Sequence, residues 1–193
     1  MTFPRITTPR LILREIKNKD IFAHSVLFSD KETMELFGGY RLSNDLGLSN
    51  VVDYFRNDFD KGYSIFWVIT LVEEMEFIGF IELKSYNSSH FDQSFAAMGD
   101  LRNDPDFLKY IDKKGWEIDY ALLKKYRGKG IMTEATQFVL DYCITCNLSP
   151  IYAKVNNLTN LATIGVLKRI GFVDFLPQIN EKGEFGMMYK WTK

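Results

Sequence analysis

The pattern of apolar and polar residues divides the chain into short β-strands separated by helical and irregular stretches. Polar and apolar residues alternate from Arg10 to Ile16 and again over 116–123, and each stretch predicts a strand with one face in the core. Two apolar runs joined by the polar residues 73–76 predict a hairpin. The predicted strands are residues 10–16, 63–71, 77–83, 116–123, 151–155, 172–176 and 185–191, the last two forming a closing hairpin that turns near 181–183.

Apolar residues at helical spacing predict helices between these strands. Asp20 is placed to cap the first helix, and residues 51–59 present Phe55 and Phe59 on one face. The last helix ends where Gly171 takes the usual C-terminal position. The predicted helices are residues 20–28, 51–59, 132–146 and 161–170. This order of elements predicts an α/β fold, in which a mixed sheet carries helices on its faces.

Residues 85–114 break this pattern. Polar residues, glycine and proline are mixed there with Phe91 and Phe95, and no period emerges. A connection of this length without its own periodicity is uncommon in a compact domain and is typical of a lid, a binding loop or an insertion. No linker or shift in composition divides the 193 residues, so we expect one domain spanning 1–193 with an irregular insertion at about 85–114.

Composition and charge narrow the classes of function. Hydrophobic residues make up 46% of the chain, enough to bury a large core, while the formal net charge is −1. So small a charge gives no global field for nucleic acid or an anionic membrane, and we expect neither as a partner. No apolar run approaches the length of a membrane helix, and the first residues lack the apolar core of a secretory signal, so we expect a cytoplasmic protein, either monomer or homodimer.

The chain has two cysteines, Cys143 and Cys146, spaced as C-x-x-C. Such a pair is typical of a redox site or of half a zinc site. There is no second pair, and His24 and His90 are distant in sequence. Because both cysteines lie in an apolar helical stretch, we interpret them as small buried hydrophobic residues and expect no metal.

The segment from Lys124 to Gly130 is the candidate anion site. It holds four cationic side chains and no acid, in a chain that is otherwise almost neutral. Its two glycines let a ligand approach the backbone, and the helix that follows directs free N–H groups and its positive dipole end toward that ligand. The sequence does not fit the P-loop, and the third glycine of the dinucleotide fingerprint is absent, since Thr133 stands in its place. Nucleotide hydrolysis and hydride transfer are therefore disfavoured.

Three ordered motifs carry a resemblance to a known family. The run Arg127-Gly128-Lys129-Gly130-Ile131-Met132-Thr133-Glu134-Ala135 resembles the R-G-x-G-[ILY]-x-T-E-A motif of the GNAT superfamily of N-acetyltransferases, in the branch related to the ribosomal-protein N-terminal acetyltransferases RimJ and RimL. Residues 8–14, T-P-R-L-I-L-R, resemble the opening strand of that branch, and residues 160–172 resemble its asparagine-led helix. The resemblance implies a mostly antiparallel central sheet that is splayed at an acetyl-CoA cleft.

The resemblance also implies residues for the coenzyme. N–H groups around Arg127, Gly128, Lys129 and Gly130 would hold the pyrophosphate, with Lys125 beside them where many members have Gln or Arg. The exposed edge of strand 117–123 would pair with the pantetheine arm. The residues expected along that arm are Leu122, Leu123, Ile131, Met132, Asn160 and Thr163. Asn160 is also a good helix N-cap, and both roles are compatible.

Direct transfer to an amine requires a base for its proton and a donor for the leaving thiolate. Glu117 is the first candidate base, because related enzymes often place a glutamate at the start of this strand, and Glu82 on the neighbouring strand is the second. The tyrosine that many members use as thiolate donor is replaced by Leu167. Thr163 keeps a hydroxyl and is the expected donor, although it is also placed to bond its own helix, and Tyr189 is the alternative.

The sequence leaves the acceptor and two other classes of function open. An α-amine, with a pKa near 8, needs less help from a base than a lysine near 10.4, which favours a peptide or protein N-terminus over other amines. Small amines remain possible acceptors. The alternatives are a catalytically degenerate sensor that binds coenzyme A, which the leucine at 167 would explain, and a phosphate-binding or nucleic-acid-binding module built on the cationic segment.

Overall fold

A computed structural model describes residues 2–36, 50–86, 112, 114–179 and 185–193. Its strands are β1 (Ile6–Thr7), β2 (Leu11–Glu15), β3 (Ser64–Leu71), β4 (Gly79–Ser85), β5 (Trp116–Leu122), β6 (Ile151–Val155), β7 (Val173–Ile179) and β8 (Phe185–Trp191). Its α-helices are α1 (Ile21–Ser29), α2 (Lys31–Leu36), α3 (Val51–Asp60), α6 (Ile131–Cys146) and α7 (Leu161–Arg169), and single 3-10 turns lie at Asn18–Asp20 and Lys124–Tyr126. The predicted insertion lies almost entirely outside the described residues.

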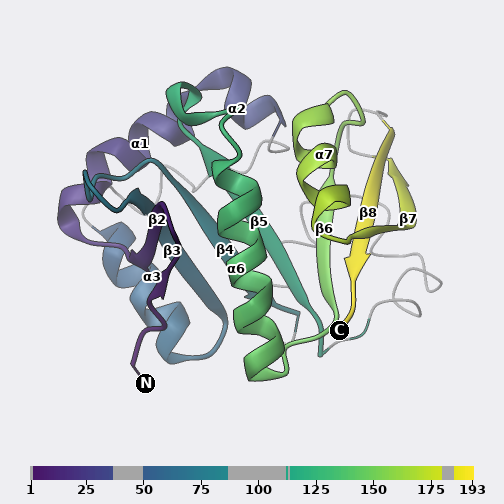
Figure 1. Ribbon diagram of the computed structural model, residues 1–193, viewed down its shortest axis with the longest axis horizontal. Helices are drawn as coiled ribbons and strands as arrows, with labels where there is room; N and C mark the ends of the chain where they lie inside the picture. The colour runs from purple at the N-terminus through teal and green to yellow at the C-terminus, as the bar shows by residue number, and fades with distance from the viewer. Residues whose placement is uncertain (1, 37–49, 87–111, 113, 180–184) are drawn as a thin grey trace.

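The strands form one sheet in the order β1-β2-β3-β4-β5-β6-β8-β7. Every neighbouring pair is antiparallel except β5 and β6, which are parallel. Figure 1 shows α6 and α7 side by side on one side of this sheet, with the chain termini both at its lower edge in that view. The predicted α/β fold with a mostly antiparallel sheet is confirmed.

Alternation along the strands divides the core between the two faces of the sheet. On β3, Trp67 and Ile69 join the apolar cluster that includes α6 and Leu167 of α7. Phe66 and Val68 point to the other face, where they pack with Phe55 and other residues of α1 and α3. Phe55 of α3 is therefore buried as predicted, whereas Phe59 is only partly buried and packs against the first cluster.

Helix α2, strand β1 and the two 3-10 turns were not predicted. Helix α2 is six residues long, too short for its apolar spacing to stand out, and β1 is two residues long. Asp20 does precede α1, but its carboxylate makes no capping hydrogen bond to that helix. The predicted capping role is wrong, because a buried arginine takes the carboxylate instead.

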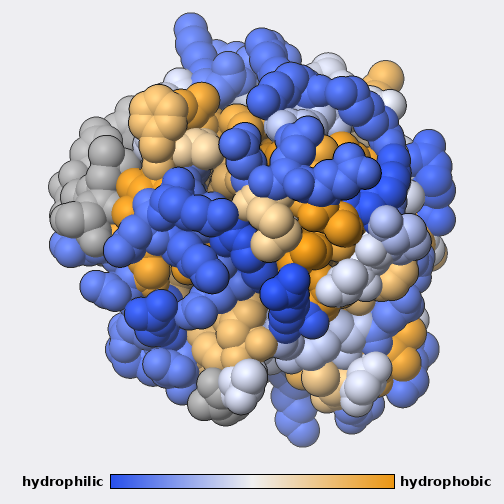
Figure 2. Space-filling model, turned by 60° about the vertical axis from the view of Figure 1, so that its left-hand side comes forward, coloured by the Kyte–Doolittle hydropathy of each residue, from blue (hydrophilic) through white to orange (hydrophobic). Residues whose placement is uncertain are grey.

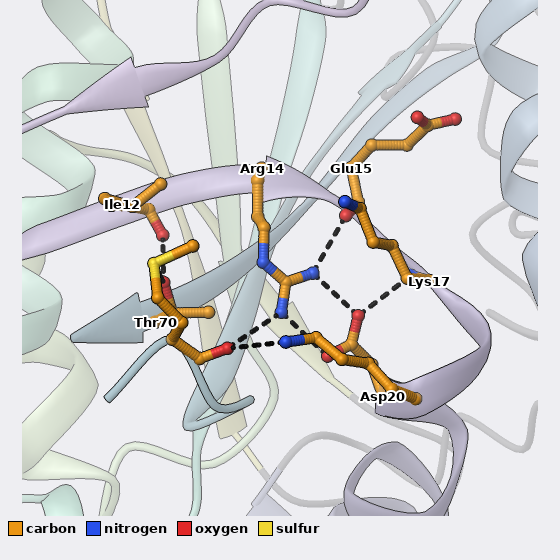
Figure 3. A network of polar contacts seen from close by, with 8 residues as sticks. Ile12, Arg14, Glu15, Lys17, Asp20 and Thr70 are labelled. Carbon is orange, nitrogen blue, oxygen red and sulfur yellow. Dashed lines mark hydrogen bonds and ion pairs between the residues drawn. The ribbon is translucent and has the colours of Figure 1, made fainter. Parts of the chain in front are cut away.

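Arg14 and Asp20 form a buried ion pair with two parallel hydrogen bonds (Figure 3). The two donor-acceptor distances are 2.7 and 2.8 Å, and the residues are only 5% and 1% exposed. Arg14 also donates to the carbonyl of Met75, and Asp20 accepts the backbone N–H of Lys17. This network ties β2 to the start of α1 and to the β3–β4 turn.

The surface seen in Figure 2 is mostly hydrophilic, with separate apolar areas between the polar side chains. Most large apolar residues of the described chain are inside, and few stand out as strongly exposed, such as Phe22 at 79% and Leu161 at 73%. None of the described helices has the length and apolar character needed to cross a bilayer.

Candidate active site

Strands β5 and β6 pair only at their beginning. The paired residues are Trp116 with Ile151 and Glu117 with Tyr152, and beyond Glu117 the two strands separate. Figure 1 shows them close at one end and apart at the other, with α6 and α7 on either side of the separation. We call this separation the opening; it leaves one edge of β5 from Ile118 onward without a strand partner in the part of the chain that the structure describes.

The backbone of β5 presents alternate residues to the opening. The N–H of Leu123 bonds to Ile78 on the β4 side at 3.0 Å, so the groups of Tyr120 and Leu122 point the other way. The carbonyl of Leu122 already accepts a hydrogen bond from Nε of Arg127 at 2.9 Å. Of the two leucines predicted to pair with the ligand, Leu123 therefore uses its N–H inside the sheet, and Leu122 keeps its N–H for the opening.

The predicted glycine turn lies where β5 ends and α6 begins. Gly128 and Gly130 have φ values of +73° and +71°, in the left-handed region that glycine adopts at least cost. The first amide to bond within the helix is that of Glu134, to the carbonyl of Gly130 at 3.1 Å. The N–H groups of Ile131 to Thr133 thus have no partner within the helix, which is the arrangement that binds anions at helix starts.

Two cations of this segment are held by α2. Lys124 forms an ion pair with Glu32, and a guanidinium nitrogen of Arg127 lies 3.8 Å from the same carboxylate. Arg127 also donates to the hydroxyl of Thr33 at 2.6 Å. Although the segment itself holds no acid, α2 supplies one, so the cationic cluster is partly neutralised. Lys125 and Lys129 are exposed and lie over the ring of Tyr126.

The other end of the opening is formed by the start of α7. The side chain of Asn160 caps the helix, because its oxygen accepts the N–H of Thr163 at 3.1 Å. The hydroxyl of Tyr120 lies 3.4 Å from the Thr163 carbonyl, so a residue of β5 reaches α7 across the opening. Tyr120 was not singled out from the sequence, since its position in an alternating strand does not reveal a contact with a distant helix.

Glu117 is buried and fully engaged. Its carboxylate lies 3.0 Å from Nζ of Lys154 and 3.5 Å from Nζ of Lys84, and it accepts a hydrogen bond from Tyr86 at 3.0 Å. Burial alone would raise the pKa of Glu117, but the two lysines and the hydrogen bonds together hold it below the usual range. A carboxylate with a lowered pKa is a weak base, so the geometry does not favour the first candidate.

Glu82 lies beside it in a different environment. It faces Asp119 in the β4–β5 register and is 6% exposed. Burial raises the pKa of Glu82 to about 7, opposed by Lys84 and reinforced by Asp119. A carboxyl group that titrates near neutral pH is suited to general base catalysis, and such groups cluster at functional sites.

The two predicted thiolate donors differ in position. Tyr189 is 3% exposed, packs in the apolar core that contains Leu167, and lies under Nζ of Lys168 at 5.3 Å. Burial raises the pKa of Tyr189 further above its usual value. Thr163 lies instead in the first turn of α7, at the opening. The structure therefore places Thr163 beside Asn160, which was predicted to contact the coenzyme, and Tyr189 in the core.

The two cysteines of α6 differ in their exposure to solvent. Cys143 is fully buried, as predicted, but Cys146 is exposed, so the interpretation of both as buried is wrong for the second. Cys146 lies in the last turn of α6, on the solvent side. Within the described ranges, no group of three or more metal-binding side chains comes together.

These elements define a class of protein: a splayed mixed sheet with a glycine turn and a helix start at the open edge. Residues 10–173 match the acetyltransferase (GNAT) domain family. The chain therefore belongs to the GNAT family and is an N-acetyltransferase, as the motifs predicted.

Solved structures share this fold over nearly the whole chain. An acetyltransferase of the GNAT family from Bacillus anthracis is 19% identical, with 98% of each chain covered and a TM-score of 0.70. Ribosomal-protein-S5-alanine acetyltransferase from Vibrio fischeri is 16% identical, with 98% of this chain and 96% of that chain covered and a TM-score of 0.73. RimL, a ribosomal alpha-N-protein acetyltransferase in complex with coenzyme A, is 16% identical, with 98% of each chain covered and a TM-score of 0.70. These likenesses show that the chain has the same fold.

Proposed function

We propose that this chain, acting as a single domain, transfers the acetyl group of acetyl-CoA to a primary amine, preferentially the α-amine of a peptide or protein. The observation that carries the proposal is the position of Glu82 relative to the opening. The free edge of β5 begins beyond Glu117, one strand away from Glu82, and leads to the glycine turn at the other end of the same strand. A thioester lying along this edge would bring its carbonyl to the buried carboxyl group.

Coenzyme binding follows from the groups at the open edge. The diphosphate would lie on the N–H groups at Gly128 to Met132, with Lys125 and Lys129 beside it. Pantetheine amides would pair with the outward groups of Tyr120 and Leu122, and the side-chain amide nitrogen of Asn160 would donate from the other side. The solved RimL complex with coenzyme A, which has the same fold, supports this assignment.

The reaction would proceed by direct attack in a ternary complex. Glu82 accepts a proton from the ammonium form of the acceptor, and the neutral nitrogen attacks the thioester carbonyl. The carbon–sulfur bond then breaks, and the second proton, which the attacking nitrogen gives up on becoming an amide, passes to the coenzyme A thiolate through the hydroxyl of Thr163 or Tyr120, which meet across the opening. Glu82 returns its own proton to solvent. Backbone N–H groups along β5 would bind the developing oxyanion.

The pKa of Glu82 favours one class of acceptor. A base with a pKa of about 7 is within roughly one unit of an α-ammonium near 8, but more than three units below a lysine near 10.4. Proton transfer from an α-amine is therefore far less costly. RimL, a ribosomal alpha-N-protein acetyltransferase of the same fold, supports the same choice.

Two peptides test the acceptor. One has a free α-amine and no lysine; the other has a blocked N-terminus and one lysine. With acetyl-CoA and the first peptide, we expect the full chain to release thiol well above the rate of acetyl-CoA hydrolysis. We expect Glu82→Gln to lower this rate by about 10²- to 10⁴-fold. Thiol release at the hydrolysis rate with every amine tested would instead identify a coenzyme-binding sensor.

Thermal unfolding tests the ligand independently of turnover. Acetyl-CoA and coenzyme A at 100 times their Kd should each stabilise the native state by about 2.7 kcal/mol, whereas ATP and NAD should not. An equal response to ATP would indicate a general phosphate site and contradict the coenzyme assignment.

A further inference from the structure

Four charged side chains alternate in sign across three neighbouring strands. Lys154 of β6 contacts Glu117 of β5, which contacts Lys84 of β4, which in turn pairs with Asp119 of β5. We call these four residues the charge chain. Their side chains are only 6% to 18% exposed, so solvent screens their interactions weakly.

The charge chain lies next to Glu82. Glu82 precedes Lys84 by two residues on β4 and faces Asp119 on β5, so all three lie on the same side of the sheet. Glu82 makes no ion pair with any other residue that the structure describes. The nearest cation on its own strand is already shared between two other carboxylates.

We propose that Glu117 is a positioning residue: by holding Lys84 together with Lys154, it keeps Lys84 from pairing with Glu82, which is thereby left to take the proton of the acceptor. The inference rests on the proposed function, because it assigns Glu117 a role in that same site. Glu117 would act without touching the substrate, through the cation that it shares with Asp119.

Several carboxylates compete for the few cations of this cluster, and this competition determines how strongly Lys84 acts on Glu82. Glu82 is influenced by Lys84 on its own strand, by Asp119 on β5 and by Asp58 on α3, while Glu117 lies two residues before Asp119 on β5. Lys154 and Tyr86 also face the cluster, through Glu117. An opposite charge within about 4–6 Å lowers a carboxyl pKa by about 1 to 3 units. Because Glu117 and Asp119 hold Lys84, Glu82 keeps a pKa at which it can act as a base near neutral pH.

Two variants shift this balance in opposite directions. Glu117→Gln leaves Lys84 and Lys154 with one carboxylate fewer, so Lys84 acts more strongly on Glu82 and lowers its pKa. The acidic limb of the plot of kcat against pH should therefore move to lower pH by about one unit. Lys84→Met removes the cation and should move the limb to higher pH. Lys84→Arg keeps the charge and should restore the wild-type profile. Asp53→Asn removes an exposed carboxylate from α3, where the side chain is 81% exposed, and should move nothing.

The measurement combines kinetics with a titration that does not depend on turnover. The kcat profile is recorded at saturating acetyl-CoA and peptide, and the carboxyl ¹³C shift of Glu82, assigned by its loss in Glu82→Gln, is followed against pH. The inference is supported if the acidic limb of kcat and the midpoint of the Glu82 titration both move to lower pH in Glu117→Gln and both move to higher pH in Lys84→Met. If Glu117→Gln does not fold, the upward movement in Lys84→Met is the remaining test.

Two results would overturn the inference while leaving the proposed function intact. In the first, Lys84→Met is active and the acidic limb of its kcat–pH profile does not move. In the second, the acidic limb is lost in Glu117→Gln but is still present in Glu82→Gln. The second result would identify Glu117 itself as the base. Absence of acetyl transfer by the wild-type chain would overturn the proposed function instead.

Discussion

Arg10 and Glu134 are 124 residues apart in sequence and form an ion pair of 2.6 Å between Nε and the carboxylate. The same carboxylate accepts the hydroxyl of Thr8 at 2.6 Å and the backbone N–H of Arg10 at 3.1 Å. Arg10 also donates to the carbonyl of Lys129 at 3.1 Å. The opening T-P-R motif and the T-E-A motif thus form one structural unit, which fixes the glycine turn against the segment that leads into β2.

Removing the charge of Glu134 should loosen this unit. Burial opposes the charged form, but the hydrogen bonds from Thr8 and Arg10 hold the pKa of Glu134 below its usual value, so the carboxylate is the form that these donors need. We expect Glu134→Gln to lower the free energy of unfolding by about 1.5 to 3 kcal/mol and to raise the KM for acetyl-CoA. Urea denaturation and steady-state kinetics would measure the two effects.

Asp141→Asn is the matched control for that variant. Asp141 is an exposed carboxylate later on the same helix, so its removal should change stability by less than about 0.5 kcal/mol and leave KM unaltered. Equal effects of both variants would mean that the contacts with Thr8 and Arg10 are unimportant.

The glycine turn gives a second prediction. An added Cβ at Gly128 would meet no atom within 4 Å, so Gly128→Ala costs only the left-handed backbone, about 1 to 2 kcal/mol. Relaxation of that strain would reorient the N–H groups of the turn, and we expect the KM for acetyl-CoA to rise at least tenfold. Gly62 has a similar φ of +71° and equally open surroundings, away from the turn. Gly62→Ala should therefore lose similar stability with an unchanged KM, and equal KM values in both variants would contradict the site.

The sheet could be predicted because its pattern is local. Alternation placed β2 to β6 and β8 within one or two residues, and the G-x-G spacing placed the glycine turn at 128–130. Pairing between strands depends on contacts distant in sequence, and alternation carries no information about them. The early end of the β5–β6 ladder is such a feature, and it is what creates the opening.

The order of the two candidate bases could not be predicted for the same reason. Both glutamates occupy inward positions of alternating strands, and only the register reveals that Lys84 and Lys154 contact Glu117 and not Glu82. One signal was available in the sequence. Lys84 is two residues after Glu82 on the same strand, so its cation could have been expected on the same side of the sheet. Helix α2 carries Glu32 to the cationic segment, but so short a helix leaves no clear pattern.

The Arg14–Asp20 pair gives a third prediction, on stability. Loss of one partner leaves the other charge buried and unpaired, so Arg14→Met or Asp20→Leu should each cost about 3 to 5 kcal/mol. In Arg14→Met/Asp20→Leu the second substitution removes the stranded charge, and the total loss should be much smaller than the sum. Urea denaturation gives the coupling energy; additive losses would contradict the pairing. The exposed pair of Lys31 and Glu35, 3.8 Å apart, should show coupling below about 1 kcal/mol.

His24 gives a prediction on the pH dependence of stability. The side chain is 2% exposed, its ring lies among Phe28, Phe55 and Phe66, and its Nε2 has no hydrogen-bond partner within the described chain. Burial lowers the pKa of His24 from 6.5 to about 4, against the opposing charge of Asp20. The unfolded chain therefore takes up a proton below pH 6.5 that the native protein refuses until about pH 4.

The stabilising contribution of neutral His24 is fully present above pH 6.5 and is lost as the pH falls toward 4, by about 3 kcal/mol in total. Glu82 acts in the opposite direction: its native pKa of about 7 lies above 4.5, so its contribution is present at low pH and is lost as the pH rises through 7. Comparison with His24→Leu isolates the histidine, because both proteins keep Glu82. Urea denaturation from pH 7 to pH 4 measures the difference in unfolding free energy between wild type and His24→Leu. This difference should shift by about 3 kcal/mol in favour of the variant as the pH falls. Parallel curves of stability against pH would mean that His24 is protonated in the native state.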